Sequence, residues 1–444
     1  MATHDDDSEA GSESVPSTRW WGEGQEGVAA GRRGDQVRAL VDAFAAQGIP
    51  IGVFPSDDRP QDMEYMYRKQ VVLTRDVDAE RVHLALGLEP TWDKRVGRDL
   101  SRDRLPASVS GLTLVSLPLQ DEQGAGQDTP YWFDRLDRAL GVGVAVPDHV
   151  VHITPGGACP ATEPLPSAGM PQPGINPDPV TDGRQVKVVV VDTGVLPDVV
   201  AEHAWLTGVT GQAEPLSVGH YRGHGTFVAG VVRTMAPATT VDVKAILVIG
   251  GGILESDLAV ALQHALSGTP DIISMSAGTT TRGGMALLAL ENFWLQHLSK
   301  LKGTVLVAAA GNDGNRGPFW PAAFPWSVSV GALDVDGARA GYSNHGSWVD
   351  VYARGSDLVN AYPRGPYQYQ EPPLAPSETS FVVGMASWSG TSFSTPLVSG
   401  LIAARMTWSG ESAREAASAL LRSGRENARL GVGAVLEPGD ASPA

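Results

Sequence analysis

Four polar residues stand where apolar segments meet glycine-rich turns, and their types suit nucleophilic catalysis. Asp192 ends the apolar run VVVVDTG, His224 stands between two glycines in YRGHGTF, and Ser392 begins an apolar helix in SGTSFSTP. A serine becomes a strong nucleophile when an imidazole takes its proton, and the imidazole needs a carboxylate to fix its tautomer. Asn312, in TVLVAAAGNDG, would supply the donor that a tetrahedral oxyanion needs. Each residue alone suits a cap or a turn, so the combination carries the prediction.

Short motifs around these residues carry a resemblance to a known family. They are VDTG at 191–194, GHGTFVAG at 223–230, SMSAG at 274–278, AAAGNDG at 308–314 and SGTSFSTP at 389–396. In this order the chain resembles the subtilisin-like serine proteases (subtilases, peptidase family S8) from residue 186 to about 425. The resemblance implies an α/β catalytic domain with a parallel sheet. It also implies a triad of Asp192, His224 and Ser392 with Asn312 in the oxyanion hole.

The same resemblance implies substrate contacts on two segments. An edge at 276–278 would pair with a peptide as an added strand, and residues beside Asn312 would form a pocket wall. The candidate substrate-binding residues are Ser276, Ala277, Gly278, Ala310, Gly311 and Asp313. The carboxylate of Asp313 would favour a basic residue before the scissile bond. An Asn-rich calcium loop, common after this histidine helix in secreted members, is missing, so we expect no tight calcium site of that kind and no cofactor.

A small α+β domain is predicted ahead of the catalytic region. Residues 66–153 alternate in the order β-α-β-α-β, ending in a strand at 144–153, and 34–54 reads as a helix followed by a strand. The α+β segment resembles the inhibitory propeptide of the family, so we expect it to act as an intramolecular inhibitor. The remaining predicted segments are a disordered acidic tail (1–20), an extension of unknown role (21–65), a Pro/Gly-rich linker (154–183), the catalytic domain (184–433) and a loose tail (434–444).

Composition limits the partners. The chain of 444 residues has 42% apolar residues and a formal net charge of −17, which argues against nucleic acid or an anionic membrane as the main partner. No run approaches the roughly 18 apolar residues of a membrane span. The opening MATHDDDSEAGSES lacks the basic and apolar regions of a secretory signal, and Cys159 is the single cysteine. We therefore expect a cytoplasmic protein.

The expected activity is hydrolysis of protein or peptide substrates by a serine endopeptidase, through an acyl-enzyme on Ser392. Two alternatives stay open at this point. In a transpeptidase or macrocyclase of the same fold, an amine replaces water in the second step. In a binding protein that keeps the fold, the serine is never activated.

Overall fold

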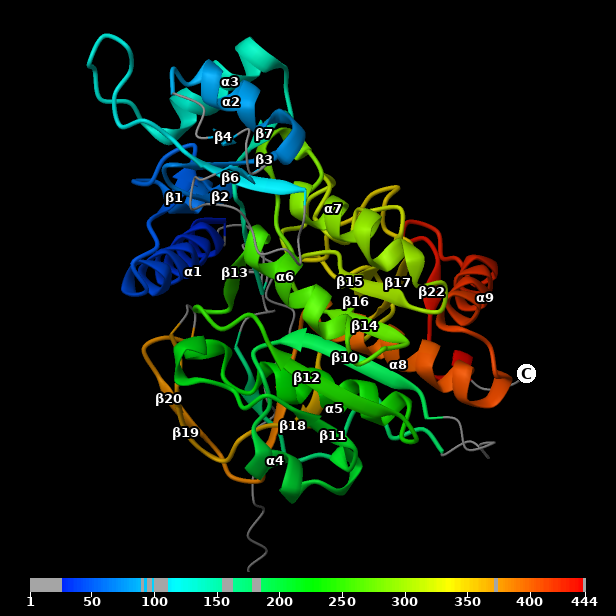
Figure 1. Cartoon of the computed structure of the whole chain (residues 1–444). Helices are drawn as coiled ribbons and strands as arrows, with labels where there is room; N and C mark the ends of the chain where they lie inside the picture. The colour runs from blue at the N-terminus through cyan, green and yellow to red at the C-terminus, as the bar shows by residue number, and fades with distance from the viewer. Residues whose placement is uncertain are drawn as a thin grey trace, which may run out of the picture.

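An eight-stranded sheet forms the centre of the structure, which is a computed structural model (Figure 1). It describes residues 26–88, 92–93, 98–99, 111–153, 163–177, 185–370 and 374–441. Every neighbouring pair of its strands runs parallel, which confirms the predicted parallel-sheet catalytic domain. In spatial order the strands are β11 (Val209–Gly211), β12 (Thr240–Ala245), β10 (Lys187–Asp192), β14 (Ile272–Met275), β15 (Val305–Ala309), β16 (Ser327–Leu333), β17 (Val351–Arg354) and β22 (Val435–Leu436).

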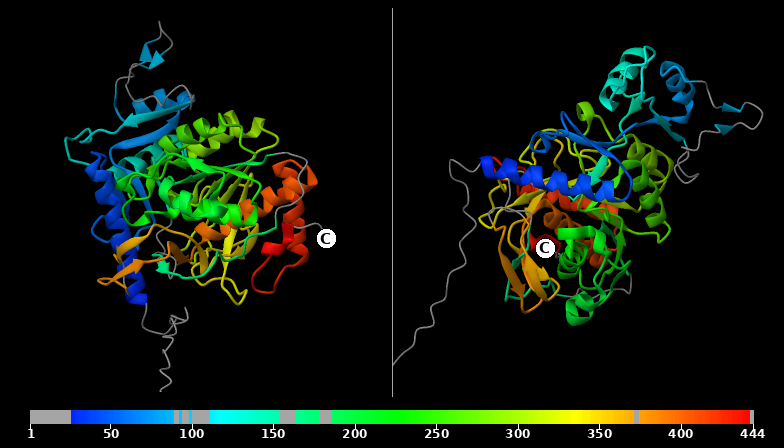
Figure 2. Two further views of the ribbon diagram at one scale, coloured as in Figure 1. Left: turned by 90° about the horizontal axis from the view of Figure 1, so that it is seen from below. Right: turned by 90° about the vertical axis from the view of Figure 1, so that its left-hand side faces the viewer.

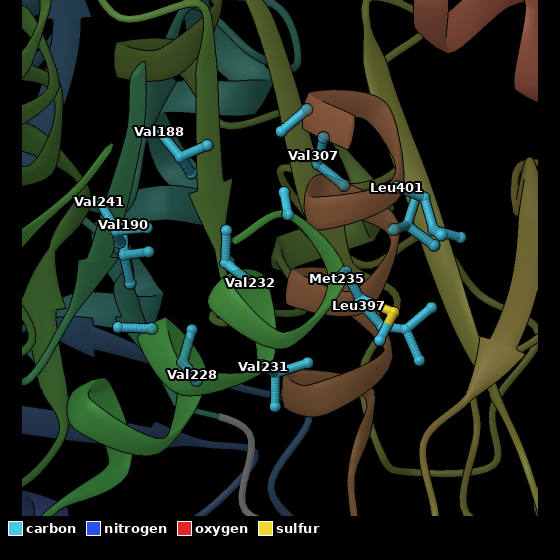
Figure 3. Close-up of a cluster of buried hydrophobic side chains, with 14 of the residues drawn as sticks. Val188, Val190, Val228, Val231, Val232, Met235, Val241, Val307, Leu397 and Leu401 are labelled. Atoms are coloured by element: carbon cyan, nitrogen blue, oxygen red, sulfur yellow. The ribbon is translucent and has the colours of Figure 1, made fainter. Parts of the chain in front are cut away.

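Helices cover both faces of this sheet. Along β10, Val188 and Val190 face one hydrophobic cluster and Val189 and Val191 face another, as expected for a strand buried on both sides. Figure 3 shows the first cluster, in which Val188 and Val190 lie beside valines of α5, and leucines of α8 lie on the other side of these valines. Burying one such valine stabilises the fold by about 1.5–3 kcal/mol. The helices of the first face are α4 (Pro197–Glu202), α5 (His224–Met235), α8 (Thr391–Ser409) and α9 (Ala413–Glu426), and those of the second are α6 (Glu255–Leu266) and α7 (Leu288–Gln296).

The N-terminal α+β region contains the predicted order of strands and helices. Its antiparallel sheet, β6-β3-β7, packs against two helices around Trp132 and Phe133. The elements are β3 (Val71–Arg75), α2 (Ala79–Ala85), β6 (Leu112–Ser116), α3 (Thr129–Leu140), β7 (Ala145–Val146) and β8 (Val150–His152). The strand predicted over 144–153 is two strands, because Pro147 between them has no N–H to donate to a ladder. Its second part, β8, leaves this sheet and pairs with β13 (Gly252–Leu254) of the catalytic domain.

A long helix precedes this region and lies across the catalytic domain (Figure 2, right). It is α1 (Glu26–Ala46), followed by a hairpin of β1 (Ile51–Phe54) and β2 (Tyr65–Arg68). The helix and strand predicted within 34–54 are therefore present, and the helix begins earlier than predicted. The boundary predicted at residue 65 falls inside the hairpin.

Two segments predicted to be loose pack against the catalytic domain. In the predicted linker, β9 (Leu165–Pro166) pairs with β21 (Met385–Trp388), and Asn176 donates a hydrogen bond to the carbonyl oxygen of Met235 at 3.0 Å. Composition misled the prediction, because a Pro-rich segment still pairs at the edge of a sheet. The predicted tail from 434 contributes β22 and a turn of 3₁₀ helix at Pro438–Ala441. The predicted acidic tail (1–20), 154–162, 178–184 and 442–444 lie outside the described residues.

Short strands complete the described elements. They are β4 (Trp92–Asp93), β5 (Arg98–Asp99), β18 (Leu358–Ala361), β19 (Gly365–Gln368) and β20 (Glu378–Phe381). None of the described helices combines the length and the apolar character that a membrane span requires.

Candidate active site

The four residues predicted to do chemistry lie where strands of the parallel sheet end and where helices packed on it begin. Asp192 is the last residue of β10, His224 is the first of α5, Ser392 is the second of α8, and Asn312 follows β15. The carboxyl ends of parallel strands form one edge of an open α/β sheet, where ligands bind. All four side chains are buried, with exposed fractions of 3% or less.

Asp192 and His224 form a buried hydrogen bond. The Nδ1 of His224 lies 2.7 Å from Oδ1 of Asp192, which also accepts a hydrogen bond from the backbone N–H of Thr193 at 2.8 Å. Because a carboxylate only accepts, the bond places the imidazole proton on Nδ1 and leaves Nε2 with a lone pair. The imidazole is therefore oriented as a base. Oδ2 of Asp192 has no hydrogen-bond partner among the described residues.

Glycines let the two loops interlock. A Cβ at Gly225 would lie 2.3 Å from the carbonyl oxygen of Gly194, which is far inside van der Waals contact. Gly225 also donates its backbone N–H to Oγ of Thr193 at 3.1 Å. The short sequences around Asp192 and His224 thus explain why the helix of the histidine starts against the end of β10.

Ser392 begins the buried helix α8 beside this pair. The ring of Phe393, the next residue, lies 5.3 Å from the imidazole of His224, and the ring of Trp388 lies at the same distance. The carbonyl oxygen of Ser392 accepts a 2.8 Å hydrogen bond from Oγ of Ser276. Its own Oγ donates to the carbonyl of Ser276 at 3.5 Å, which is at the limit for a hydrogen bond and holds the hydroxyl weakly.

Thr391 fixes the orientation of Asn312. Oδ1 of Asn312 accepts hydrogen bonds from the backbone N–H of Thr391 at 2.9 Å and from its hydroxyl at 2.8 Å. These donors identify the oxygen of the amide, so Nδ2 is the group left to donate. A Cβ at Gly390 would lie 3.5 Å from Nδ2, which places this donor beside the start of α8. Asn312 can therefore offer a hydrogen bond next to Ser392.

The predicted substrate edge already holds a strand of the chain itself. Gly278 exchanges two backbone hydrogen bonds with His152, at 3.0 and 3.1 Å. The other edge of β8 pairs with β13, and the next residue, Ile153, donates to the carbonyl of Gly251 at 2.9 Å. Sequence reasoning identified one wall, Ser276–Gly278, and missed the other at Gly252–Leu254. Three consecutive glycines at 250–252 were the available signal.

The segment beside Asn312 is tied into the protein by Asn344, which sequence reasoning also missed. Its Nδ2 donates to the carbonyl of Ala310 at 2.8 Å, and its backbone N–H donates to the carbonyl of Gly311 at 2.9 Å. The N–H groups of Ala310 and Gly311 donate to the carbonyl of Val330 and to Oγ of Thr391. The backbone N–H groups of both residues are thus used inside the chain and are not available to a substrate strand.

Asp313, predicted to lie at a pocket wall, lies close to α1. Its side chain is 9% exposed, and its Oδ1 lies 3.8 Å from Nη2 of Arg33 in α1. Burial raises the pKa of Asp313 above its ordinary value, and the Arg33 guanidinium opposes this shift. Arg33 belongs to α1, so a distant part of the sequence contributes to the surroundings of Asp313. Among the described residues, no group of three or more His, Cys, Asp and Glu side chains is placed to hold a metal ion.

A family model described as the subtilase family, Peptidase S8, matches residues 183–432. The chain belongs to the subtilase family. This is a family of serine proteases, as the sequence motifs predicted.

Individual relatives of this subtilase match about half of its chain. A thermophilic serine proteinase of Bacillus sp. (strain AK1) is 32% identical over 234 residues, 49% of this chain and 51% of that protein. Thermitase of Thermoactinomyces vulgaris is 29% identical over 50% of this chain and 75% of its own. Among solved structures, the self-cleaved protease domain of PatA is 28% identical with a TM-score of 0.45, covering 58% of this chain and 94% of that one.

Proposed function

We propose that this subtilase is a serine endopeptidase that cleaves peptide bonds through an acyl-enzyme on Ser392. The observation that carries the proposal is the buried hydrogen bond between Asp192 and His224 beside the first turn of α8. The strand β8 supports cleavage within chains, because an internal segment of polypeptide lies along the edge at Gly278.

The proposed reaction has two halves. Oγ of Ser392 attacks the carbonyl carbon of the scissile bond while Nε2 of His224 takes the hydroxyl proton. The oxyanion accepts a hydrogen bond from Nδ2 of Asn312, and the N-terminal end of α8 adds a favourable dipole. Nε2 then gives the proton to the leaving amine as the C–N bond breaks, which leaves an ester on Ser392. Water repeats the sequence on the ester and releases the acid.

Mass spectrometry of products from a defined peptide pool tests this proposal. Hydrolysis gives paired fragments whose masses add up to the substrate plus one water, whereas a transpeptidase gives joined or cyclic products. Ser392→Ala and His224→Ala should each lower kcat by roughly 10⁶, and the double variant should lose little more, because the pair acts as a unit. An intact pool with wild type from which the N-terminal region has been removed would leave only the binding-protein alternative.

We further propose that residues 26–153 inhibit the site within the same chain. The strand β8 uses the backbone groups of Gly252–Leu254 and Gly278 that a substrate strand would use. Arg282 of the catalytic domain pairs with Asp134 and Asp137 of α3, at 2.7 and 2.5 Å, and so anchors the α+β region beside the cleft.

The helix α1 adds a second layer over this strand. Its side chains Leu40 and Phe44 are buried in one cluster with Val150 of β8 and Leu254 of β13. Arg33, from the same helix, approaches Asp313. The extension to which the sequence assigned no role thus covers the strand in the cleft, and we propose that it holds that strand in place.

A further inference from the structure

Glu214 connects the two loops that carry Asp192 and His224. Its Oε1 accepts a hydrogen bond from Oγ of Thr193 at 2.6 Å, and both of its carboxylate oxygens accept from the backbone N–H of Gly223, at 3.0 and 2.9 Å. Thr193 follows Asp192 in the chain, and Gly223 precedes His224. One side chain therefore holds a direct neighbour of each member of the pair.

The backbone brings Glu214 to this place. Val195 donates to the carbonyl of Gln212 at 2.9 Å, and Glu214 donates to the carbonyl of Val195 at 3.0 Å. A Cβ at Gly194 would lie 2.8 Å from Cα of Glu214, so only glycine allows the two segments to meet so closely. The carboxylate is thus fixed against the turn that follows Asp192 by main-chain contacts.

Glu214 also holds the residue that precedes α5, while Oγ of Thr193 accepts the hydrogen bond from the first turn at Gly225. The residue before this helix, Gly223, has φ +83° and no side chain to accept a hydrogen bond from the first turn. Glu214 accepts from its N–H and places a negative charge at the positive end of the helix dipole. Because His224 is the first residue of α5, this contact fixes the start of the helix that carries the imidazole.

The pKa of Glu214 shows that its buried position is unfavourable for the ionised carboxylate. Burial raises the pKa of Glu214 to about 7, and the Asp192 carboxylate raises it further. The hydrogen bonds from Thr193 and Gly223 and the charge of Arg222 act in the opposite direction. The phenol of Tyr362 is the other titratable group that interacts with Glu214. A buried carboxylate this close to Asp192 is unfavourable for the stability of the fold. Its position therefore points to a role other than stability.

We propose that Glu214 is a positioning residue that holds Asp192 and His224 in register through Thr193 and Gly223. The proposal rests on the proposed function of the pair. Loss of this clamp changes kcat, because displacements of about 1 Å at a catalytic pair cost up to about a hundredfold. KM stays nearly constant, because the hydrogen bonds described for Glu214 reach Thr193, Gly223 and Val195 and not the substrate walls.

Two variants of Glu214 and one control separate positioning from charge. Glu214→Ala should lower kcat about 10- to 100-fold with KM within about twofold. Glu214→Gln keeps an acceptor oxygen, so it should restore kcat to within about fivefold of wild type. Glu202→Gln, which removes an exposed carboxylate paired with Arg364, should leave kcat and KM unchanged.

A proton NMR spectrum of the full chain gives a readout that does not need activity. The Nδ1 proton of His224, bonded to Asp192, should give a resonance far downfield of the amide region. We expect Glu214→Ala to shift or broaden it by exposing the bond to exchange, and Glu202→Gln to leave it in place. Thr193→Val should resemble Glu214→Ala, and Thr193→Ser, which keeps the hydroxyl, should resemble wild type. This pair keeps the test open if Glu214→Ala does not fold.

The outcomes distinguish this inference from the proposed function. If wild type cleaves peptides and Glu214→Ala keeps both its kcat and the downfield resonance, the inference is wrong and the proposed function stands. If wild type freed of its N-terminal region cleaves nothing while the resonance of the full chain still responds to Glu214→Ala, the proposed function fails and the positioning role stands.

Discussion

His152 and Gly278 exchange two backbone hydrogen bonds, one in each direction, at 3.1 and 3.0 Å. His152 belongs to the N-terminal region and is 3% exposed, while Gly278 ends the motif SMSAG of the catalytic domain. A Cβ at Gly278 would lie 2.3 Å from Phe319, so this edge approaches its surroundings as closely as glycine allows. The chain thus occupies the peptide-binding edge of its own proposed active site, and both the regulation and the chemistry of the protein can be tested from this contact.

Removing the amide of Asn312 should affect the chemical step and leave binding almost unchanged. Asn312→Ala should reduce kcat by about 10²–10³ with little change in KM, because its hydrogen bond strengthens as charge develops on the oxyanion. Thr391→Val removes one of the two donors to Oδ1 and should give a smaller loss of the same kind, whereas Thr391→Ser should not. Steady-state kinetics decide the matter. An effect confined to KM would make Asn312 a substrate-binding residue.

Asp313 should favour a basic substrate residue once α1 is displaced. In the full chain Arg33 lies near this carboxylate, and a Lys or Arg side chain of a substrate would take its place. Asp313→Asn should lower the preference for Lys or Arg over Phe before the scissile bond by up to about fivefold, because solvent limits such a pair to about 1 kcal/mol. The control is Asp336→Asn, a turn carboxylate in an exposed loop. Equal preferences in wild type and Asp313→Asn would refute this role.

Docking of the N-terminal region should weaken as the pH rises. At its interface, burial raises the pKa of Asp148 to about 7 and raises that of Glu255, while burial lowers the pKa of His149 to about 3. Asp148 accepts hydrogen bonds from Ser256, and His149 lies 3.4 Å from Glu255. Burial also lowers the pKa of His152, in β8 itself, to about 4. Other charged groups nearby are Asp257, Arg68, Arg282 and Arg33.

The sign follows from the protons that each state binds. Asp148 and Glu255 stay protonated in the docked state at pH values where they ionise after separation. Their contribution to the free energy of docking is therefore full below about pH 4 and is lost as the pH rises through about 7. His149 and His152 act in the opposite direction below about pH 6.5, so the net loss is steepest above that pH. Hydrogen exchange of the β8 amides in Ser392→Ala should report an opening free energy that falls from pH 5 to pH 8. Glu255→Gln should flatten this fall, and Glu122→Gln, at an exposed pair with Arg135, should not. A pH-independent opening free energy would contradict the prediction.

Maturation should separate the N-terminal region from the catalytic domain. If that region is an inhibitor, the chain should cut itself within about 154–165, directly after the strand that lies in the cleft. Ser392→Ala should accumulate as the intact chain of 46.6 kDa, while wild type loses its N-terminal third. A chain starting near residue 160 should fold slowly, because the parallel sheet depends on non-local contacts. Intact-mass measurement decides between these outcomes. A fully active wild type that stays uncut would show that the region serves recognition or regulation.

The sequence predicted the parts of the site that local motifs encode. Asp192, His224, Asn312 and Ser392 lie at element ends with glycine neighbours, and parallel strands bring such ends to one edge of the sheet. Glu214 and Asn344 were not predicted, because each acts through hydrogen bonds to residues distant in sequence or to backbone groups that no motif marks. The position of α1 over Asp313 depends on contacts across nearly 280 residues, which no periodic pattern records.

Labelling by a fluorophosphonate probe tests the central claim most directly, because the probe reacts with a serine only when a neighbouring base activates it. After removal of the N-terminal region, wild type should take up one probe per chain, and peptide mapping should place it on Ser392. His224→Ala should label at a rate lower by several orders of magnitude, and Ser392→Ala should not label at all. Label on another residue, or equal labelling of wild type and His224→Ala, would contradict the account.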